Sequence, residues 1–234
     1  MSLLLVLFFV LDCVAQPVSY VRRVIGGSES NREIIVEQYG DGADVIALLA
    51  SIHGTEPAGT PLSIQFAAYI SANPTILENK TILLIHVTNP DGVVEGIRGN
   101  RNNIDINRNF PTDNFGRGIF NGEEPVSAIE TQVLLDFLEE YQPDRLLVFH
   151  QPVNCIDFDG NSEALAKHMS DVSGMRIKRL GSRSGSLGTY IAYKLEKEII
   201  TLELPSYASG KEAEWLWTNY GALLIAFVEF PFEK

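Results

Sequence analysis

The chain has 234 residues and a formal net charge of −12. This acidic balance argues against non-specific binding to nucleic acid, because the phosphates would be repelled. Hydrophobic residues make up 45% and charged residues 21%, which is typical of a globular protein with a sizeable core. The two cysteines exclude both a disulfide framework and a zinc site built from cysteines.

The N-terminus contains a continuous apolar run at residues 3–11, followed by Cys13, Val14 and Ala15. The run is shorter than the roughly 20 residues that span a bilayer, so we expect no stable membrane insertion. It is typical of a signal peptide cleaved after Ala15, although no Lys or Arg precedes it. This interpretation predicts a periplasmic or secreted protein with a mature chain of residues 16–234. The alternative is a buried N-terminal strand in a cytoplasmic protein.

The remaining chain alternates between strand and helix patterns. Glycines and polar residues predict a turn at residues 26–31. Short, mostly apolar runs predict strands at residues 32–38, 44–50, 81–87, 146–149 and 199–202. Helical spacing of apolar residues predicts helices at residues 61–72, 125–141, 162–172, 185–195 and 212–227. Such alternation predicts an α/β sandwich with a mostly parallel sheet. No repeat or linker divides it, so we expect one domain.

Residues 89–124 form a long polar segment with little periodicity. In a compact domain, a segment of this length usually carries function. It contains Arg98, Arg101 and Arg108, and guanidinium groups suit carboxylates because they present a rigid fork of donors. A solvated basic loop is the alternative.

The histidines indicate a metal site. His53 and His150 each follow or end a predicted strand, and Glu56 comes three residues after His53. Because ligand sites in α/β sheets lie at the carboxyl ends of strands, these side chains can converge. Two imidazoles and one carboxylate form a His2Glu zinc set that leaves a fourth position open for water. The other histidines have different interpretations: His86 as a hydrogen-bonded core residue and His168 as a solvated one.

Glu203 ends the predicted strand at residues 199–202 and faces the same edge of the sheet. A carboxylate there could take a proton from water and return it to a leaving amine. The alternative is a surface glutamate at the start of a loop.

Taken together, these residues resemble the zinc carboxypeptidase family. The matching pieces are H-x-x-E at residues 53–56, NPDG at 89–92, Arg98, DINRNFP at 105–111, His150 and TLEL at 201–204. The resemblance implies a three-layer α/β/α sandwich with a mixed, mostly parallel central sheet.

The resemblance also implies roles for individual residues. Zinc would be bound by His53, Glu56 and His150. Arg98 would stabilise the oxyanion, and Glu203 would act as general base and acid. Asn107 and Arg108 would hold the terminal carboxylate of the substrate.

Within the family, the short chain and the motifs at residues 98–111, 149–156 and 185–188 resemble small bacterial members. Those members cleave the bond between γ-D-glutamate and meso-diaminopimelate in murein tripeptides. We therefore expect a murein tripeptide as substrate. The alternatives are the C-termini of ordinary peptides, N-acyl amino acids, and a non-catalytic protein that binds zinc or peptides.

One departure concerns the mobile tyrosine of larger carboxypeptidases. Residues 180–184 contain no tyrosine at the corresponding place, and Tyr190 comes later in the chain. We expect Arg183, or alternatively Arg179, to face the substrate there.

Overall fold

The computed structural model describes residues 18–231. Within this range the chain forms a mixed seven-stranded sheet with strand order β1-β2-β4-β3-β5-β7-β6. The strands are β1 Tyr20–Gly27, β2 Glu33–Tyr39, β3 Asp44–Leu49, β4 Lys80–Ile85, β5 Arg145–His150, β6 Val153–Asp159 and β7 Glu198–Pro205. The four central strands pair in parallel, and antiparallel pairing brings in β1 and β2 at one edge and β6 at the other. The mixed sheet agrees with the expectation.

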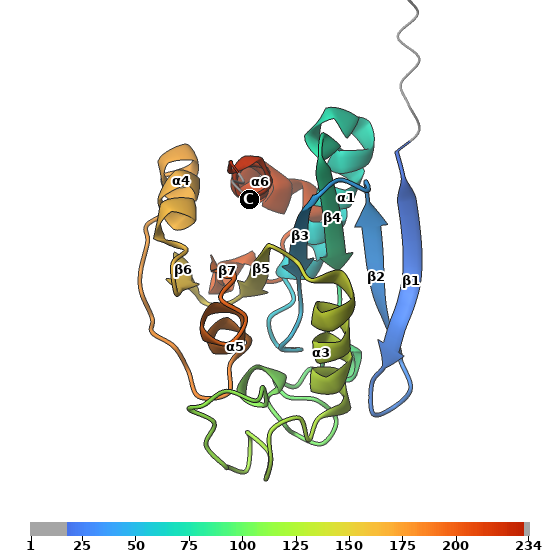
Figure 1. Cartoon of the computed structure of the whole chain (residues 1–234), viewed down its shortest axis with the longest axis vertical. Helices are drawn as coiled ribbons and strands as arrows, with labels where there is room; N and C mark the ends of the chain where they lie inside the picture. Colours follow the sequence, from blue (N-terminus) through green and yellow to red (C-terminus); the bar gives the residue numbers. More distant parts are fainter. Residues whose placement is uncertain (1–17, 232–234) are drawn as a thin grey trace, which may run out of the picture.

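Helices cover both faces of the sheet (Figure 1). One face packs against α1 Gly59–Ala72, α4 Glu163–Ser173 and α6 Ala213–Glu229. The other packs against α3 Ile129–Tyr141 and α5 Leu187–Tyr193. Successive side chains of a strand point to opposite faces, so Ile46 and Leu48 join the first core while Ala47 and Leu49 join the second. Both faces are buried, and this explains why the central strands read as continuous apolar runs.

The structure adds two strands at the sheet edges. β1 includes Gly26 and Gly27, so the prediction of a turn at these two glycines is wrong. Most of β1 is exposed on both faces, and an edge strand of this kind needs no apolar pattern. In β6 apolar and polar residues do alternate, and Ile156 and Phe158 lie in the core. Helix α3 begins at Ile129 rather than at residue 125, because Val126 has a φ of 62°.

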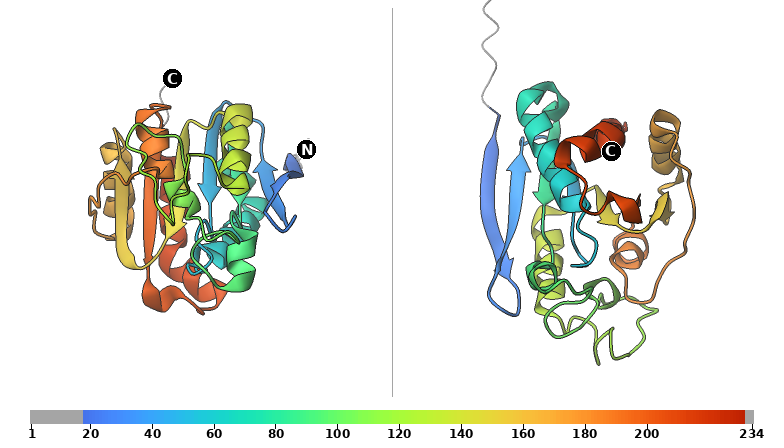
Figure 2. Two further views of the ribbon diagram at one scale, coloured as in Figure 1. Left: turned by 90° about the horizontal axis from the view of Figure 1, so that it is seen from below. Right: turned by 180° about the vertical axis from the view of Figure 1, so that it is seen from behind.

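The long segment at residues 89–124 contains α2 Pro90–Glu95 and a short 3-10 helix, Ile106–Arg108. It lies beside the beginnings of α3 and α5 (Figure 1; Figure 2, right). The side chain of Asn107 accepts a hydrogen bond from the backbone of Leu187, at 2.8 Å. The side chain of Asn109 accepts one from Ala128, at 2.9 Å. These bonds hold the segment at the carboxyl ends of the parallel strands.

The predicted signal peptide, residues 1–15, lies outside the described residues, and it stays a prediction. None of the helices within residues 18–231 is both long and apolar enough to cross a membrane.

Candidate metal centre

His53, Glu56 and His150 converge as the sequence predicted. His53 and Glu56 lie on the turn after β3, and His150 ends β5, the parallel neighbour of β3. One ligand atom from each residue lies within 4.8 Å of the others. All three side chains are buried. The three donors can therefore bind one ion at the edge of the sheet.

The turn that carries His53 and Glu56 packs against α2. A Cβ on Gly54 would lie 2.0 Å from the carbonyl carbon of Gly92, so this close approach requires glycine. Asn89 caps α2 by accepting a hydrogen bond from the backbone of Gly92, and it donates to the carbonyl of Gly99. The NPDG motif thus supports the ligand turn.

The hydrogen bonds of His53 prepare it to bind a cation. Its Nε2 lies 2.9 Å from Oδ1 of Asp105, so the ring proton sits on Nε2 and the lone pair on Nδ1. The buried Nδ1 makes no hydrogen bond within the described residues, yet it lies 3.0 Å from Oε1 of Glu56. Two acceptors facing each other at this distance repel unless a proton or a metal ion lies between them. The donor set, with two imidazoles and one carboxylate, fits zinc.

Glu56 is held as a carboxylate by its surroundings. Burial alone would raise its pKa, but the hydrogen bond from His150 and the close contact with His53 lower the pKa far below its usual range. His150 Nδ1 lies 2.8 Å from Glu56 Oε2, and Arg98 donates to Glu56 Oε1 at 2.7 Å. The carboxylate is therefore charged and oriented.

Asp105 is a site residue whose role the sequence did not reveal, although it lies in the DINRNFP motif. One carboxylate oxygen accepts from His53 and the other from Nε of Arg98, at 3.0 Å. Burial would raise its pKa, but these contacts lower it well below the usual range, with the bond to His53 contributing most. The signal was available, because metal-bound histidines commonly donate to a carboxylate.

Glu203 lies beside the three ligands. It is the register partner of His150 on the adjacent parallel strand β7. Its Oε2 accepts a hydrogen bond from the backbone of Val153 at 3.2 Å, and the side chain is buried. Glu203 lines the same cavity as the ligands, so it is not a surface residue at a loop start.

Three arginines line this cavity, namely Arg98, Arg108 and Arg183. Burial lowers the pKa of Arg108, which Asp105 partly opposes, and the neighbouring Arg98 and Arg183 lower it further. Arg108 donates to the carbonyl of Asn107, and it forms no ion pair within residues 18–231. Its guanidinium can therefore receive an anion from solution. Asn107 also lies in the site, with its Nδ2 3.1 Å from Nε2 of His150.

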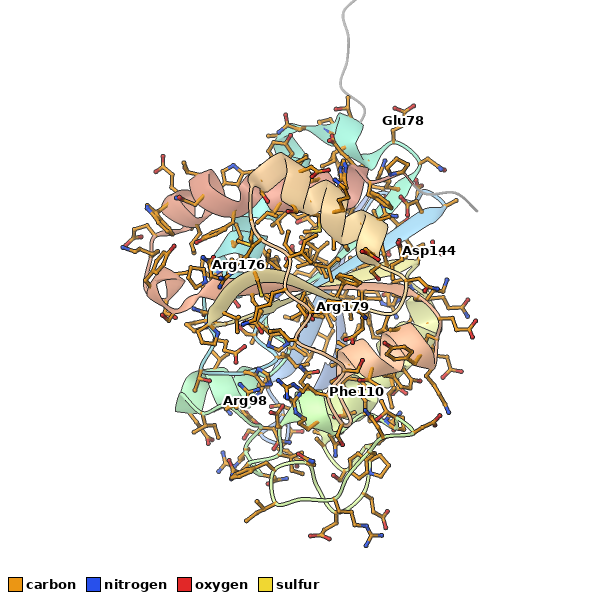
Figure 3. All side chains as sticks on the ribbon, turned by 90° about the vertical axis from the view of Figure 1, so that its left-hand side faces the viewer. Glu78, Arg98, Phe110, Asp144, Arg176 and Arg179 are labelled. Atoms are coloured by element: carbon orange, nitrogen blue, oxygen red, sulfur yellow. The ribbon has the colours of Figure 1, made fainter. Side chains whose placement is uncertain are left out.

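Arg179 and Tyr190 are not among the residues that line this cavity. The guanidinium of Arg179 lies over the ring of Phe158, 4.7 Å from its centroid, and the residue lies beside β6 (Figure 3). Tyr190 packs against Phe110 at a centroid distance of 5.8 Å. Of the two arginines expected near the substrate, Arg183 is the one that lines the cavity.

The two other histidines lie outside the cluster. His86 is hydrogen-bonded as predicted, with Ser63 at 2.7 Å and Glu37 at 3.3 Å. The prediction for His168 is wrong in part, because its half-buried ring packs against Phe230 at a centroid distance of 5.5 Å.

The cavity lined by the three ligands, Glu203 and the arginines has a volume of about 230 Å³. Its wall along β6 and β7 contains Asp157, Asp159 and Thr201. Sequence reasoning missed the two aspartates because it did not predict β6. The alternation Ile156, Asp157, Phe158, Asp159 was the available signal.

Comparisons with known proteins agree with this geometry. The profile of the peptidase M14 family, described as "Zinc carboxypeptidase", matches residues 12–217. Murein peptide amidase A of Escherichia coli strain K12 is 29% identical over 185 residues, which cover 71% of this chain and 74% of that protein.

Solved structures share the fold. The murein-tripeptide amidase from Escherichia coli O157 superposes with a TM-score of 0.69 at 22% identity, covering 91% of this chain and 93% of that one. Carboxypeptidase A from Helicoverpa armigera superposes with a TM-score of 0.75 at 16% identity, covering 92% of this chain and 70% of that one.

The sheet, the ligand triad and these matches define a metallopeptidase, and the chain belongs to the zinc carboxypeptidase family. Its zinc site consists of His53, Glu56 and His150. When bound there, zinc supplies Lewis-acid chemistry, polarising a carbonyl oxygen and lowering the pKa of water to about 7.

Proposed function

We propose that the protein is a zinc-dependent amidase that acts on murein peptides. It would cleave the bond between γ-D-glutamate and meso-diaminopimelate, releasing a residue that bears a carboxylate. The observation that supports this most strongly is the shared cavity of the zinc ligands, Glu203 and the three arginines. The similarity to murein peptide amidase A supports the choice of murein peptides over other amides.

In the proposed reaction Glu203 is the general base and then the general acid. Its carboxylate takes a proton from the attacking water, whose oxygen adds to the carbonyl carbon of the scissile amide. The same proton then passes to the nitrogen of the leaving amine as the C–N bond breaks. The position of Glu203 beside His150 supports this role, because it puts the carboxylate next to the metal ligands.

Arg98 would stabilise the negative charge that develops on the carbonyl oxygen. Its guanidinium is positioned by the two carboxylates Glu56 and Asp105, while about half of its side chain remains exposed. A donor fixed before the reaction favours the transition state over the ground state.

Arg108 and Asn107 would bind the carboxylate of the leaving residue. Arg108 is charged, largely buried and without an ion pair within the described residues. A fixed guanidinium can accept a carboxylate in a bidentate arrangement. Arg183, on the same cavity, would contribute further positive charge.

Metal analysis and a substrate panel test this proposal. The zinc-loaded protein is incubated with L-Ala-γ-D-Glu-meso-diaminopimelate, with unmodified peptides and with N-acyl amino acids, and the products are identified by mass. Release of diaminopimelate from the murein tripeptide alone supports the proposal. Preferential cleavage of ordinary peptides or N-acyl amino acids would favour those alternatives, and zinc binding without hydrolysis of any substrate would indicate a non-catalytic protein.

We also propose that the protein acts in the periplasm or after secretion, since residues 1–15 have the pattern of a signal peptide. N-terminal sequencing of the mature protein tests this. A mature chain that begins at Gln16 supports export, and one that begins at Met1 or Ser2 supports a cytoplasmic enzyme.

A further inference from the structure

Glu203, the proposed base, has a single hydrogen-bond donor to its carboxylate within residues 18–231. The backbone N–H of Val153 donates to its Oε2 at 3.2 Å. Val153 is the first residue of β6, three residues after the zinc ligand His150. The orientation of this carboxylate therefore depends on how firmly the start of β6 is held.

The pairing of β6 with β7 is incomplete at this point. The register partner of Val153 is Pro205, which has no N–H to donate to the carbonyl of Val153. The next residue, Asn154, has a φ of 56°, so its backbone departs from the extended conformation of a strand, and it has no register partner on β7. Regular pairing resumes only with Cys155. A group outside the sheet is needed to fix the two residues before it.

Arg176 lies beside β6 (Figure 3), and its guanidinium supplies donors at this point. Its Nη2 donates to the carbonyl of Val153 at 3.2 Å, and its Nε donates to the carbonyl of Asn154 at 3.3 Å. The rigid, planar fork of an arginine suits two neighbouring acceptors. Arg176 therefore bridges the two residues at which the pairing is incomplete.

The backbone of Arg176 is itself fixed to the edge of the sheet. The N–H of Ile156 donates to the carbonyl of Arg176, and the N–H of Lys178 donates to the carbonyl of Ile156, both at 3.0 Å. Although the Arg176 residue is exposed, its side chain donates only to the two carbonyls of β6 in the described part of the chain. A substitution of Arg176 would thus remove this bridge and little else.

We propose that Arg176 is a positioning residue: by bridging the carbonyls of Val153 and Asn154, it fixes the N–H that orients Glu203. This proposal rests on the proposed function, because it takes Glu203 as the base. It adds a residue that does not line the cavity and acts on the reaction through one backbone amide.

Kinetics of Arg176 variants test the positioning. Arg176→Gln removes the fork, and we expect kcat to fall about 10-fold while KM stays within about twofold of wild type, because a small displacement of a reacting group is costly. Arg176→Lys keeps the charge without the fork and should restore only part of kcat. Arg179→Gln is the matched control, since it removes the same charge from a guanidinium that lies over Phe158, and it should keep wild-type kcat. Wild-type kcat in Arg176→Gln, or full restoration by lysine, would overturn the proposal.

A double-variant cycle separates positioning of Glu203 from a general effect on the structure. If Arg176 acts through Glu203, adding Arg176→Gln to Glu203→Gln should lower kcat by no more than about twofold, because the base is already absent. An independent effect would multiply the two losses and overturn the proposal.

A measurement without substrate tests the contact itself. Amide hydrogen exchange of isotope-labelled, zinc-loaded protein is followed by NMR. Exchange at Val153 should be about 10-fold faster in Arg176→Gln than in wild type or Arg179→Gln, since the start of β6 opens more often. Unchanged exchange would overturn the positioning and leave the proposed function intact. Faster exchange, combined with wild-type turnover in Glu203→Gln, would support the control of this N–H by Arg176 and refute only the proposed base.

Discussion

His150 and Glu203 are register partners on the parallel strands β5 and β7, so a zinc ligand and the proposed base lie side by side at one edge of the sheet. Their spacing is set by backbone pairing rather than by a loop. His150 is further tied to Glu56 at 2.8 Å, and Glu56 to Arg98 at 2.7 Å. The rigid sheet therefore positions the proposed base, and the long segment before α3 supplies the arginine.

Glu203→Gln should abolish most of the activity without affecting zinc. Glutamine keeps the size and the hydrogen-bond capacity of the side chain but cannot take a proton, and we expect kcat to fall by about 10²- to 10⁴-fold. None of the three ligands changes, so the zinc content should match that of wild type. Turnover of a susceptible peptide and metal analysis of the same sample provide the test.

Glu229→Gln serves as the control, since Glu229 is exposed at the end of α6. It should retain wild-type turnover. Wild-type turnover in Glu203→Gln would show that another group accepts the proton.

Asp105→Asn should weaken zinc binding. The substitution removes the negative charge that orients the His53 ring and raises its basicity, and loss of such a partner costs about 10- to 100-fold in metal affinity. Competition against a chelator of known affinity measures the change. Asp113→Asn, whose side chain is 93% exposed, is the control. An unchanged zinc affinity in Asp105→Asn would mean that the hydrogen bond to His53 does not support the metal site.

Arg108→Ala should raise KM more than it lowers kcat. The proposed contact with the leaving carboxylate exists before and during the reaction, so losing it mainly weakens binding. A charge-assisted contact of this kind predicts an increase in KM of about 10- to 100-fold. Peptides with a free and an amidated C-terminus distinguish the interpretations. If the substitution lowers kcat/KM equally for the free and the amidated peptide, Arg108 does not bind that carboxylate.

The strands that form the centre of the fold could be predicted because they are buried on both faces. β3, β4, β5 and β7 all correspond to continuous apolar runs. Strand β1 could not be predicted in this way, since an exposed edge strand needs no apolar side chains. β6 had a visible alternation, but its cavity-facing acids look like loop residues in the sequence alone. The edge strands were therefore missed for two different reasons.

The zinc ligands could be predicted because H-x-x-E follows one buried strand and His150 ends another. A carboxylate partner for a metal-bound histidine can be expected, but sequence spacing does not show that Asp105, 52 residues from His53, is that partner. The choice between Arg179 and Arg183 likewise depends on tertiary structure. Arg179 stacks on Phe158 and is thereby turned away from the cavity.

Arg145→Met should destabilise the fold strongly without changing the chemistry of the site. Arg145 is completely buried and forms a bidentate pair with Asp44, at 2.9 and 3.0 Å. Removing one partner leaves a buried charge, which costs about 3–5 kcal/mol. Urea unfolding gives the free energy, and the double variant Arg145→Met/Asp44→Leu should recover part of the loss. A loss below about 1 kcal/mol in Arg145→Met would show that water or backbone groups compensate Asp44.

His86 should make the protein less stable as the pH falls below about 6.5. Burial lowers its folded-state pKa, which the hydrogen bond to Glu37 only partly offsets. Between the lowered folded pKa and the unfolded value of about 6.5, the unfolded chain binds more protons. Stability is therefore complete above pH 6.5 and declines below it. The pKa of Glu37 is lowered from 4.5 in the folded state, so protonation of Glu37 reduces stability only when the pH falls below about 4.5.

His86→Gln tests this pH dependence, since glutamine keeps hydrogen-bonding capacity but does not titrate. Melting temperatures of the wild type and the variant are compared at pH 7.5 and pH 5.0 in the presence of a chelator. The chelator removes the effect of zinc, and all titratable groups other than His86 are common to both proteins. The drop in melting temperature on acidification should be smaller in the variant. An equal drop in both proteins would mean that His86 has the same pKa in the folded and unfolded states.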